Sequence, residues 1–137
     1  MKRYKFGEAT VPRSWLWLLR KARHRGWNGW VNGPRGGLRT YAQQASLYAL
    51  YKAGRGAPAF PPWGPSRHLV RNVKKKGGWY AAMDVSDPEG LIDAAAKLGV
   101  RLHRPYPHEP WHVEAVKPFY APKHFTPLDG MTYAPRK

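Results

Sequence analysis

Apolar residues recur at the spacing of an α-helix in the first half of the chain. The stripe over residues 12–25 predicts a first helix, with Thr10 as its cap. A second stripe, over residues 41–53, predicts another helix that Thr40 caps. The apolar positions of the two stripes are Trp15, Leu16, Leu18, Leu19 and Ala22, then Ala45, Leu47, Tyr48, Leu50 and Tyr51. The first stripe is expected to face the core.

The second half of the chain alternates short apolar runs with one further helix. Residues 79–85, 100–102 and 111–116 have the composition of strands. Asp87 followed by proline is typical of a helix start and predicts a helix that runs to about residue 98. The resulting order of helix, helix, strand, helix, strand, strand indicates an α+β fold, with helices packed on a small antiparallel sheet.

Three segments are expected to be irregular. Residues 54–65 hold four prolines and three glycines and predict a loop, and residues 70–78 predict a basic, turn-like connection. Residues 117–137 show no period and predict an irregular C-terminal tail. At 137 residues the chain has the commonest size of one domain, so residues 1–137 are interpreted as a single domain.

The charge of the chain narrows the classes of partner. Lys and Arg number 24 against 8 Asp and Glu, a net charge of +16. Such a field attracts polyanions, whether nucleic acid, anionic lipid surfaces or phosphate-rich polymers of a bacterial envelope. The chain has no Cys, which excludes disulfides and thiolate zinc fingers. No apolar run predicts a transmembrane segment, and residues 1–8 lack the apolar stretch of a signal peptide, so synthesis in the cytoplasm is expected.

Three short motifs carry the candidate chemistry. Ser66-Arg67-His68, Ala82-Met83-Asp84 and Glu109-Pro110-Trp111-His112 supply two imidazoles, one carboxylate and a further carboxylate three positions before the last imidazole. A catalytic zinc site needs three protein ligands, an open position for water, and a base. The motifs therefore predict a site for one Zn²⁺ ion.

These motifs resemble the D-alanyl-D-alanine carboxypeptidase and dipeptidase family (VanX and VanY type), which also includes L-alanyl-D-glutamate endopeptidases of bacteriophages. Residues 38–44, Leu-Arg-Thr-Tyr-Ala-Gln-Gln, resemble the arginine motif upstream in that family. The resemblance covers about residues 38–114, in the family's order. It implies a small α+β domain of the hedgehog and D-Ala-D-Ala-peptidase kind.

The resemblance also implies roles for individual residues. His68, Asp84 and His112 would be the zinc ligands, and Glu109 would be the general base and later the proton donor. Arg39 would stabilise the substrate carbonyl and the tetrahedral intermediate.

Three further residues are predicted to contact substrate. The resemblance makes Ser66 a supporting or substrate-contacting residue and Trp111 a wall of the site. His108 adjoins Glu109 in the sequence and is a candidate substrate contact. His103, His108 and His124 are also alternative ligands.

One interval departs from the family pattern. Asp84 follows His68 by 16 positions, whereas the family usually has seven. Either a basic insertion of about nine residues lies between them, or the first ligand is misassigned. Ser66 precedes His68, and Ala82 precedes Asp84, in the family manner, which favours the insertion.

These observations predict a monomeric zinc metallopeptidase that hydrolyses bacterial peptidoglycan stem peptides, as a phage or prophage endolysin released onto the cell wall. Its expected partners are peptidoglycan and anionic envelope polymers. The alternative is a basic nucleic-acid-binding or phage structural protein with an incidental metal motif, favoured by the basic residues 71–76 near Trp79 and Tyr80. A third reading keeps the fold but binds cell wall without cutting it.

Overall fold

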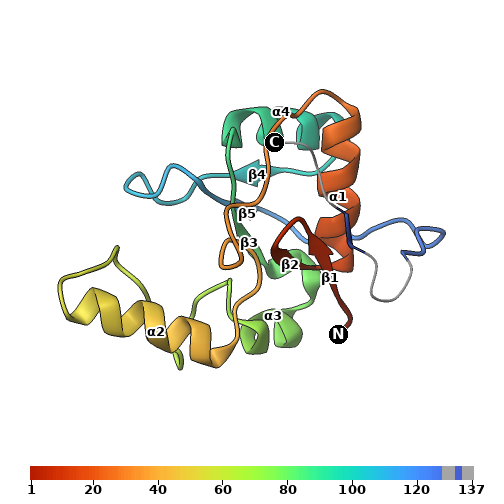
Figure 1. Cartoon of the computed structure of the whole chain (residues 1–137). Helices are drawn as coiled ribbons and strands as arrows, with labels where there is room; N and C mark the ends of the chain where they lie inside the picture. Colours follow the sequence, from red (N-terminus) through yellow and green to blue (C-terminus); the bar gives the residue numbers. More distant parts are fainter. Residues whose placement is uncertain (128–131, 134–137) are drawn as a thin grey trace.

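The computed structural model describes residues 1–127 and 132–133, and it has the predicted α+β class (Figure 1). In chain order the elements are β1 (Arg3–Phe6), β2 (Ala9–Pro12), α1 (Arg13–His24), α2 (Tyr41–Lys52), α3 (Val70–Lys76), the 3-10 turn η1 (Gly78–Tyr80), β3 (Ala82–Asp84), α4 (Pro88–Lys97), β4 (Leu102–His103), β5 (His112–Ala115) and β6 (Thr132–Tyr133). Within the described part of the chain, no helix is long and apolar enough to cross a membrane.

Two of the three predicted helix caps are confirmed. Thr40 accepts a hydrogen bond from the backbone of Gln43, whose side chain bonds back to Thr40, so α2 begins with a complete capping box. Asp87 accepts from the backbone N–H of Gly90 at the start of α4. The prediction for α1 was wrong, because Thr10 lies in β2 and α1 begins after Pro12 without a side-chain cap.

Strands β1 and β2 form an antiparallel hairpin at the N-terminus that the sequence interpretation missed. Tyr4 and Phe6 alternate with exposed residues, but four residues per strand give too short an alternation to stand out. β6 pairs with β1 in parallel, so the segment predicted as an irregular tail includes a short strand.

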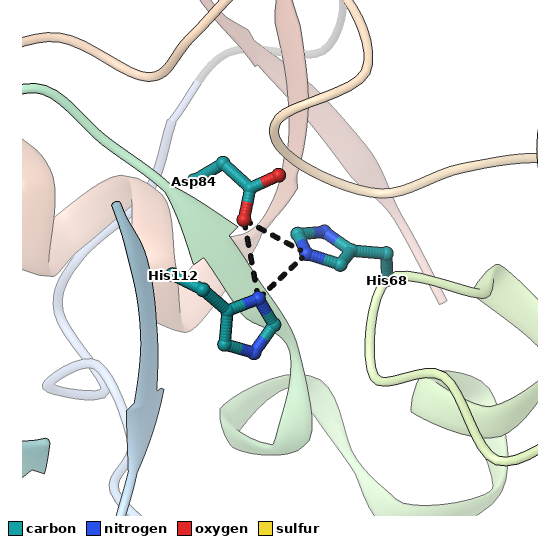
Figure 2. Close-up of side chains that lie close together, drawn as sticks. All are labelled: His68, Asp84 and His112. Carbon is teal, nitrogen blue, oxygen red and sulfur yellow. Dashed lines mark hydrogen bonds and ion pairs between the residues drawn. The ribbon is translucent and has the colours of Figure 1, made fainter. Parts of the chain in front are cut away.

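The second sheet has the order β3-β5-β4 and is antiparallel throughout. Asp84 on β3 is the register partner of His112 on β5 (Figure 2). Ala82 is the register partner of Glu114. Side chains of directly opposed residues lie on the same face. The register therefore places Asp84 and His112 side by side. The predicted strand over 79–85 is shortened to Ala82–Asp84, because Gly78–Tyr80 forms a 3-10 turn.

The basic segment after His68 is helix α3 rather than the predicted turn-like connection. Val73 is fully buried and Val70, three positions earlier, packs against the core. This i, i+3 pair gives the segment an apolar face. That face is hard to recognise in the sequence because most of the other residues are charged.

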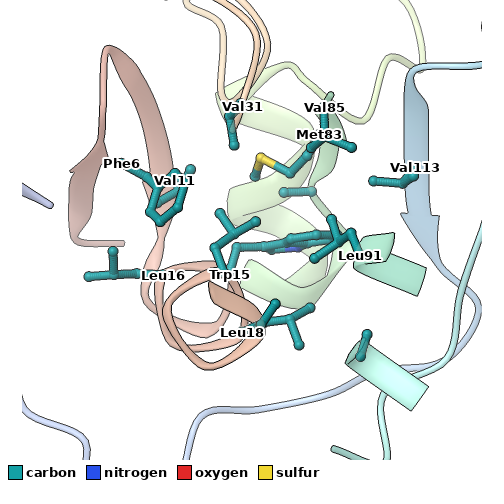
Figure 3. Close-up of a cluster of buried hydrophobic side chains, with 14 of the residues drawn as sticks. Phe6, Val11, Trp15, Leu16, Leu18, Val31, Met83, Val85, Leu91 and Val113 are labelled. Carbon is teal, nitrogen blue, oxygen red and sulfur yellow. The ribbon is translucent and has the colours of Figure 1, made fainter. Parts of the chain in front are cut away.

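The core lies between the first strands, α1 and the second sheet (Figure 3). Trp15 of α1 is completely buried at its centre, and Met83 of β3 and Val113 of β5 are buried from the sheet side. Phe119 packs edge-on against Trp15, so the chain after residue 117 closes the core.

Helix α2 and the loop that follows it extend away from the rest of the molecule (Figure 1). Gln44 is the only residue of α2 that is buried. The helix and residues 54–65 are called the arm below.

Candidate metal centre

Three segments bring His68, Asp84 and His112 together, as the sequence predicted (Figure 2). His68 lies just before α3, Asp84 ends β3 and His112 begins β5. Oδ1 of Asp84 is 3.2 Å from Nε2 of His68 and 3.2 Å from Nδ1 of His112. The two ring nitrogens are 3.3 Å apart. The three donor atoms thus form a nearly equilateral triangle.

The long interval between His68 and Asp84 does not separate them in space. The backbone N–H of Ala82 donates to the carbonyl of Arg67 at 3.0 Å. The residues between Arg67 and Ala82 form α3 and η1, and this hydrogen bond joins the two ends of that segment. His68 and Asp84 can therefore act together at one site despite this interval.

A backbone carbonyl fixes the ring of His68. Nδ1 lies 2.8 Å from the carbonyl oxygen of Gly37. Since a carbonyl can only accept, Nδ1 carries the proton and Nε2 turns its lone pair to the triangle. Gly37 itself lies so close to β2 that a Cβ atom there would be 2.3 Å from the carbonyl oxygen of Thr10. A side chain at this position would displace the carbonyl that orients His68.

A carboxylate fixes the ring of His112. Nε2 donates to Oε2 of Glu114 at 2.8 Å, which leaves Nδ1 as the donor atom facing Asp84. Oε1 of Glu114 in turn accepts from Arg67 at 3.2 Å. Metal-binding imidazoles are commonly held in this way by a carboxylate on the second nitrogen.

Arg39 binds the carboxylate oxygen of Asp84 that lies outside the triangle. Its Nη2 is 3.1 Å from Oδ2. The same guanidinium donates to Oε1 of Gln44 at 3.2 Å and to the carbonyl of Arg35 at 2.7 Å. These contacts leave Oδ1 as the single oxygen that Asp84 presents to the triangle.

The donor set fits a metal ion. Ligand atoms about 2.0–2.1 Å from a tetrahedral zinc ion lie about 3.3 Å from one another, close to the distances found here. The other nitrogen of each imidazole has a partner that holds the required tautomer. The buried group His68, Asp84 and His112 can therefore hold a metal ion.

The electrostatics of the site favour a cation. Burial lowers the pKa of His68, and the attraction of Asp84 offsets this only in part. Burial acts in the same direction on His112, but its hydrogen bonds to Asp84 and Glu114 outweigh burial and raise its pKa to about 9. Burial acts to raise the pKa of Asp84, yet the two imidazoles and Arg39 hold it well below its usual range. In the absence of metal, the extra proton therefore resides on His112.

Glu109 lies beside the triangle without belonging to it. Its Oε1 is 3.8 Å from Nδ1 of His112, and its Oε2 is 3.3 Å from Nε2 of His108. Glu109 precedes the strand by a turn in which the N–H of His112 donates to its carbonyl. Its carboxylate is thus near the donor atoms and remains partly exposed to solvent.

A cavity of about 510 Å³ joins these residues to the arm. All eight predicted site residues line it, namely Arg39, Ser66, His68, Asp84, His108, Glu109, Trp111 and His112. Trp111 is 38% exposed, whereas Ser66 is buried and accepts the N–H of His68 at its hydroxyl. The opposite wall includes Tyr48 and Phe60 of the arm. His103 and His124 do not line the cavity.

Sequence interpretation missed several residues that support the site. Glu114 pairs with Arg67 and also binds His112, two positions away on the same strand face. Tyr106 packs its ring 5.1 Å from that of His112, and no local pattern marks it. Gln44 joins Arg39 to the carbonyl of Phe60 at 2.8 Å, a contact made by the fold of the arm.

Comparison with known proteins gives no family for the chain. No family model, curated protein or solved structure matches it.

Proposed function

We propose that the protein is a zinc peptidase that hydrolyses peptide bonds in the stem peptides of bacterial peptidoglycan. The observation that carries the proposal is the triangle of His68, Asp84 and His112, whose donor atoms are 3.2–3.3 Å apart. The sequence motifs around these residues add the resemblance to the D-alanyl-D-alanine peptidase family.

The three triangle residues would hold the zinc ion, with Gly37, Glu114 and Arg39 fixing their orientation. When bound, zinc supplies Lewis acidity that polarises a peptide carbonyl and makes a water molecule more acidic. The chain offers two imidazoles and one carboxylate oxygen, the ligand types of catalytic zinc sites that leave a position open.

Glu109 is the proposed general base. Its carboxylate is next to the donor atoms and faces the cavity, where it can take a proton from the attacking water. The same carboxyl group can then return the proton to the leaving amine. His108 contacts the second oxygen of Glu109.

Arg39 is proposed to stabilise the substrate carbonyl and the tetrahedral intermediate. Its three hydrogen bonds use three of the five N–H donors of a guanidinium. Two donors remain, and the side chain lines the cavity. Arg39 can therefore bind Asp84 and also donate a hydrogen bond to a substrate carbonyl. The apolar wall formed by the arm provides contact area for the rest of the peptide.

Two measurements test the proposal. Purified protein should contain one zinc ion per chain, and wild type should release peptide fragments from cell walls. Glu109→Gln should retain zinc and lose about 10²–10⁴-fold in rate, while Glu8→Gln, an exposed carboxylate outside the cavity, should match wild type. Equal release by Glu109→Gln and wild type would refute the mechanism. Mass spectrometry of the fragments identifies the bond that is cut.

A further inference from the structure

Helix α3 carries a cluster of cations on the segment inserted between two of the triangle residues. Arg71, Lys74, Lys75 and Lys76 are all exposed, while Val73 is turned into the core. Residues 71, 74 and 75 stand at i, i+3 and i+4 and so are neighbours on the helix surface. None of the four forms an ion pair with any residue in the described part of the chain.

The helix is attached firmly to the segment that carries His68. Leu69, directly after His68, is buried and precedes the first turn of α3. Asn72 donates from its side chain to the carbonyls of Gly64 and Ser66, at 2.8 and 2.9 Å. A ligand bound to the exposed side of α3 would therefore be held at a fixed position relative to the metal centre.

The distribution of charge leaves this surface strongly basic. Of the 8 acidic residues in the chain, Asp84, Glu109 and Glu114 line the cavity, and Glu89 pairs with Arg104. Three of the eight acidic residues thus lie at the site, and few remain to offset the basic residues elsewhere in a chain of net charge +16. Such a surface attracts polyanions with a strength that depends on salt.

The aromatic residues near α3 argue against a single-stranded nucleic acid as the ligand. Single-stranded nucleic acids bind through bases stacked on exposed aromatic rings. The guanidinium of Arg67 lies 4.2 Å from the ring centroid of Tyr80 and 5.7 Å from that of Trp79. The two rings also pack edge to face against each other. α3 itself offers lysine charges, which bind phosphates without reading bases.

We propose that α3 is a docking surface for the phosphodiester polymer that is attached to peptidoglycan in bacterial cell walls. The proposal rests on the proposed function, since the polymer and the stem peptides belong to the same wall. Docking would raise the local concentration of stem peptide at the cavity without a new contact to the scissile bond.

Sedimentation with isolated cell walls tests the docking surface. The probes are walls that carry a polyol phosphate polymer, the same walls after hydrofluoric acid has removed it, and a short DNA duplex. The variant Lys74→Gln/Lys75→Gln/Lys76→Gln removes three charges from α3, and glutamine preserves helix propensity. The control Lys21→Gln/Lys97→Gln/Lys117→Gln removes three exposed charges elsewhere.

The α3 variant should lose at least about tenfold in affinity for polymer-bearing walls, and its salt dependence should fall by roughly two to three in slope. The control should change by less than about threefold, and stripped walls should bind wild type more weakly. Equal losses in both variants, equal binding of stripped walls, or tighter binding of DNA would overturn the proposal. Release of peptide fragments from stripped walls by wild type measures the proposed peptidase activity independently of docking.

Discussion

Glu114 binds Nε2 of His112 from two positions further along the same strand, at 2.8 Å. The contact holds the ring proton on Nε2, so Nδ1 is the atom that can act as a ligand once it is deprotonated. The sheet therefore supplies both a candidate ligand and the group that orients it. This relationship gives the first prediction.

Replacing Glu114 with alanine should weaken zinc binding by about 10–100-fold, because His112 loses the partner that fixes its tautomer and ring orientation. Competition with a chromophoric chelator measures the affinity. Glu89→Ala is the matched control, since Glu89 also pairs with an arginine but is exposed and outside the cavity. Equal affinities of Glu114→Ala and wild type would show that the contact does not prepare a ligand.

Removing either imidazole of the triangle should abolish stoichiometric zinc. His68→Ala and His112→Ala should each contain much less than one zinc per chain by elemental analysis. Zinc at about 100 times its Kd should stabilise wild type by about 2.7 kcal/mol and leave both variants unchanged. His124→Ala, an exposed histidine outside the cavity, should behave as wild type. Zinc retained by both triangle variants would place the ion elsewhere.

The pKa of His112 predicts opposite effects of pH on the metal-free and zinc-bound protein. A pKa of about 9, above the usual 6.5, means that the proton stabilises the metal-free fold. That contribution is complete below pH 6.5 and is lost as pH rises through about 9. Zinc must displace the proton, so zinc affinity should rise over the same interval.

Urea unfolding with a chelator present, from pH 6 to pH 10, measures the first effect. Zinc titration calorimetry in buffers of different ionisation enthalpy measures the proton released. His112→Gln should flatten the metal-free profile between pH 6.5 and 9. Zinc binding without proton release at pH 7.5 would mean that His112 is already neutral.

Gln44 connects the arm to the candidate metal centre. It should contribute more to the stability of the fold than its neighbour Gln43. Its side chain binds both Arg39 and the carbonyl of Phe60, and it is 1% exposed. Gln44→Leu leaves these partners unsatisfied and should cost about 1–3 kcal/mol in urea unfolding. It should also speed proteolysis within residues 54–65.

Gln43→Ala is the control on the same helix. Gln43 contributes its side chain only to the exposed capping box, so its loss should cost about 1 kcal/mol or less and leave proteolysis of the arm unchanged. Equal stability and equal cleavage of the two variants would show that the arm is held independently of Gln44.

The helices could be predicted where apolar spacing and capping chemistry agreed. α2 and α4 begin at Thr40 and Asp87 as expected, since each cap is a local hydrogen bond between near neighbours. α3 was missed because its helical evidence is one pair of valines among charged residues. The β1–β2 hairpin buries its apolar residues in the same core as α1, which sequence periodicity over four residues does not reveal.

The three residues of the triangle could be predicted from the sequence motifs and the family that they resemble, but their surroundings could not. The carbonyl of Gly37 orients His68 through the backbone, so no residue type indicates it. The contact between Arg39 and Asp84 depends on how residues 36–39 lie against β3, including the bond from the N–H of Asp84 to the carbonyl of Gly36. Such contacts join segments far apart in the sequence.

The hydrogen bond from Ala82 to Arg67 joins the two ends of the segment that forms α3 and η1. Because this bond fixes the ends of the segment, the number of residues between His68 and Asp84 can change while the two donor atoms stay 3.2 Å apart. Intervals along the sequence therefore do not define this site. Three donor atoms and their hydrogen-bonding partners do.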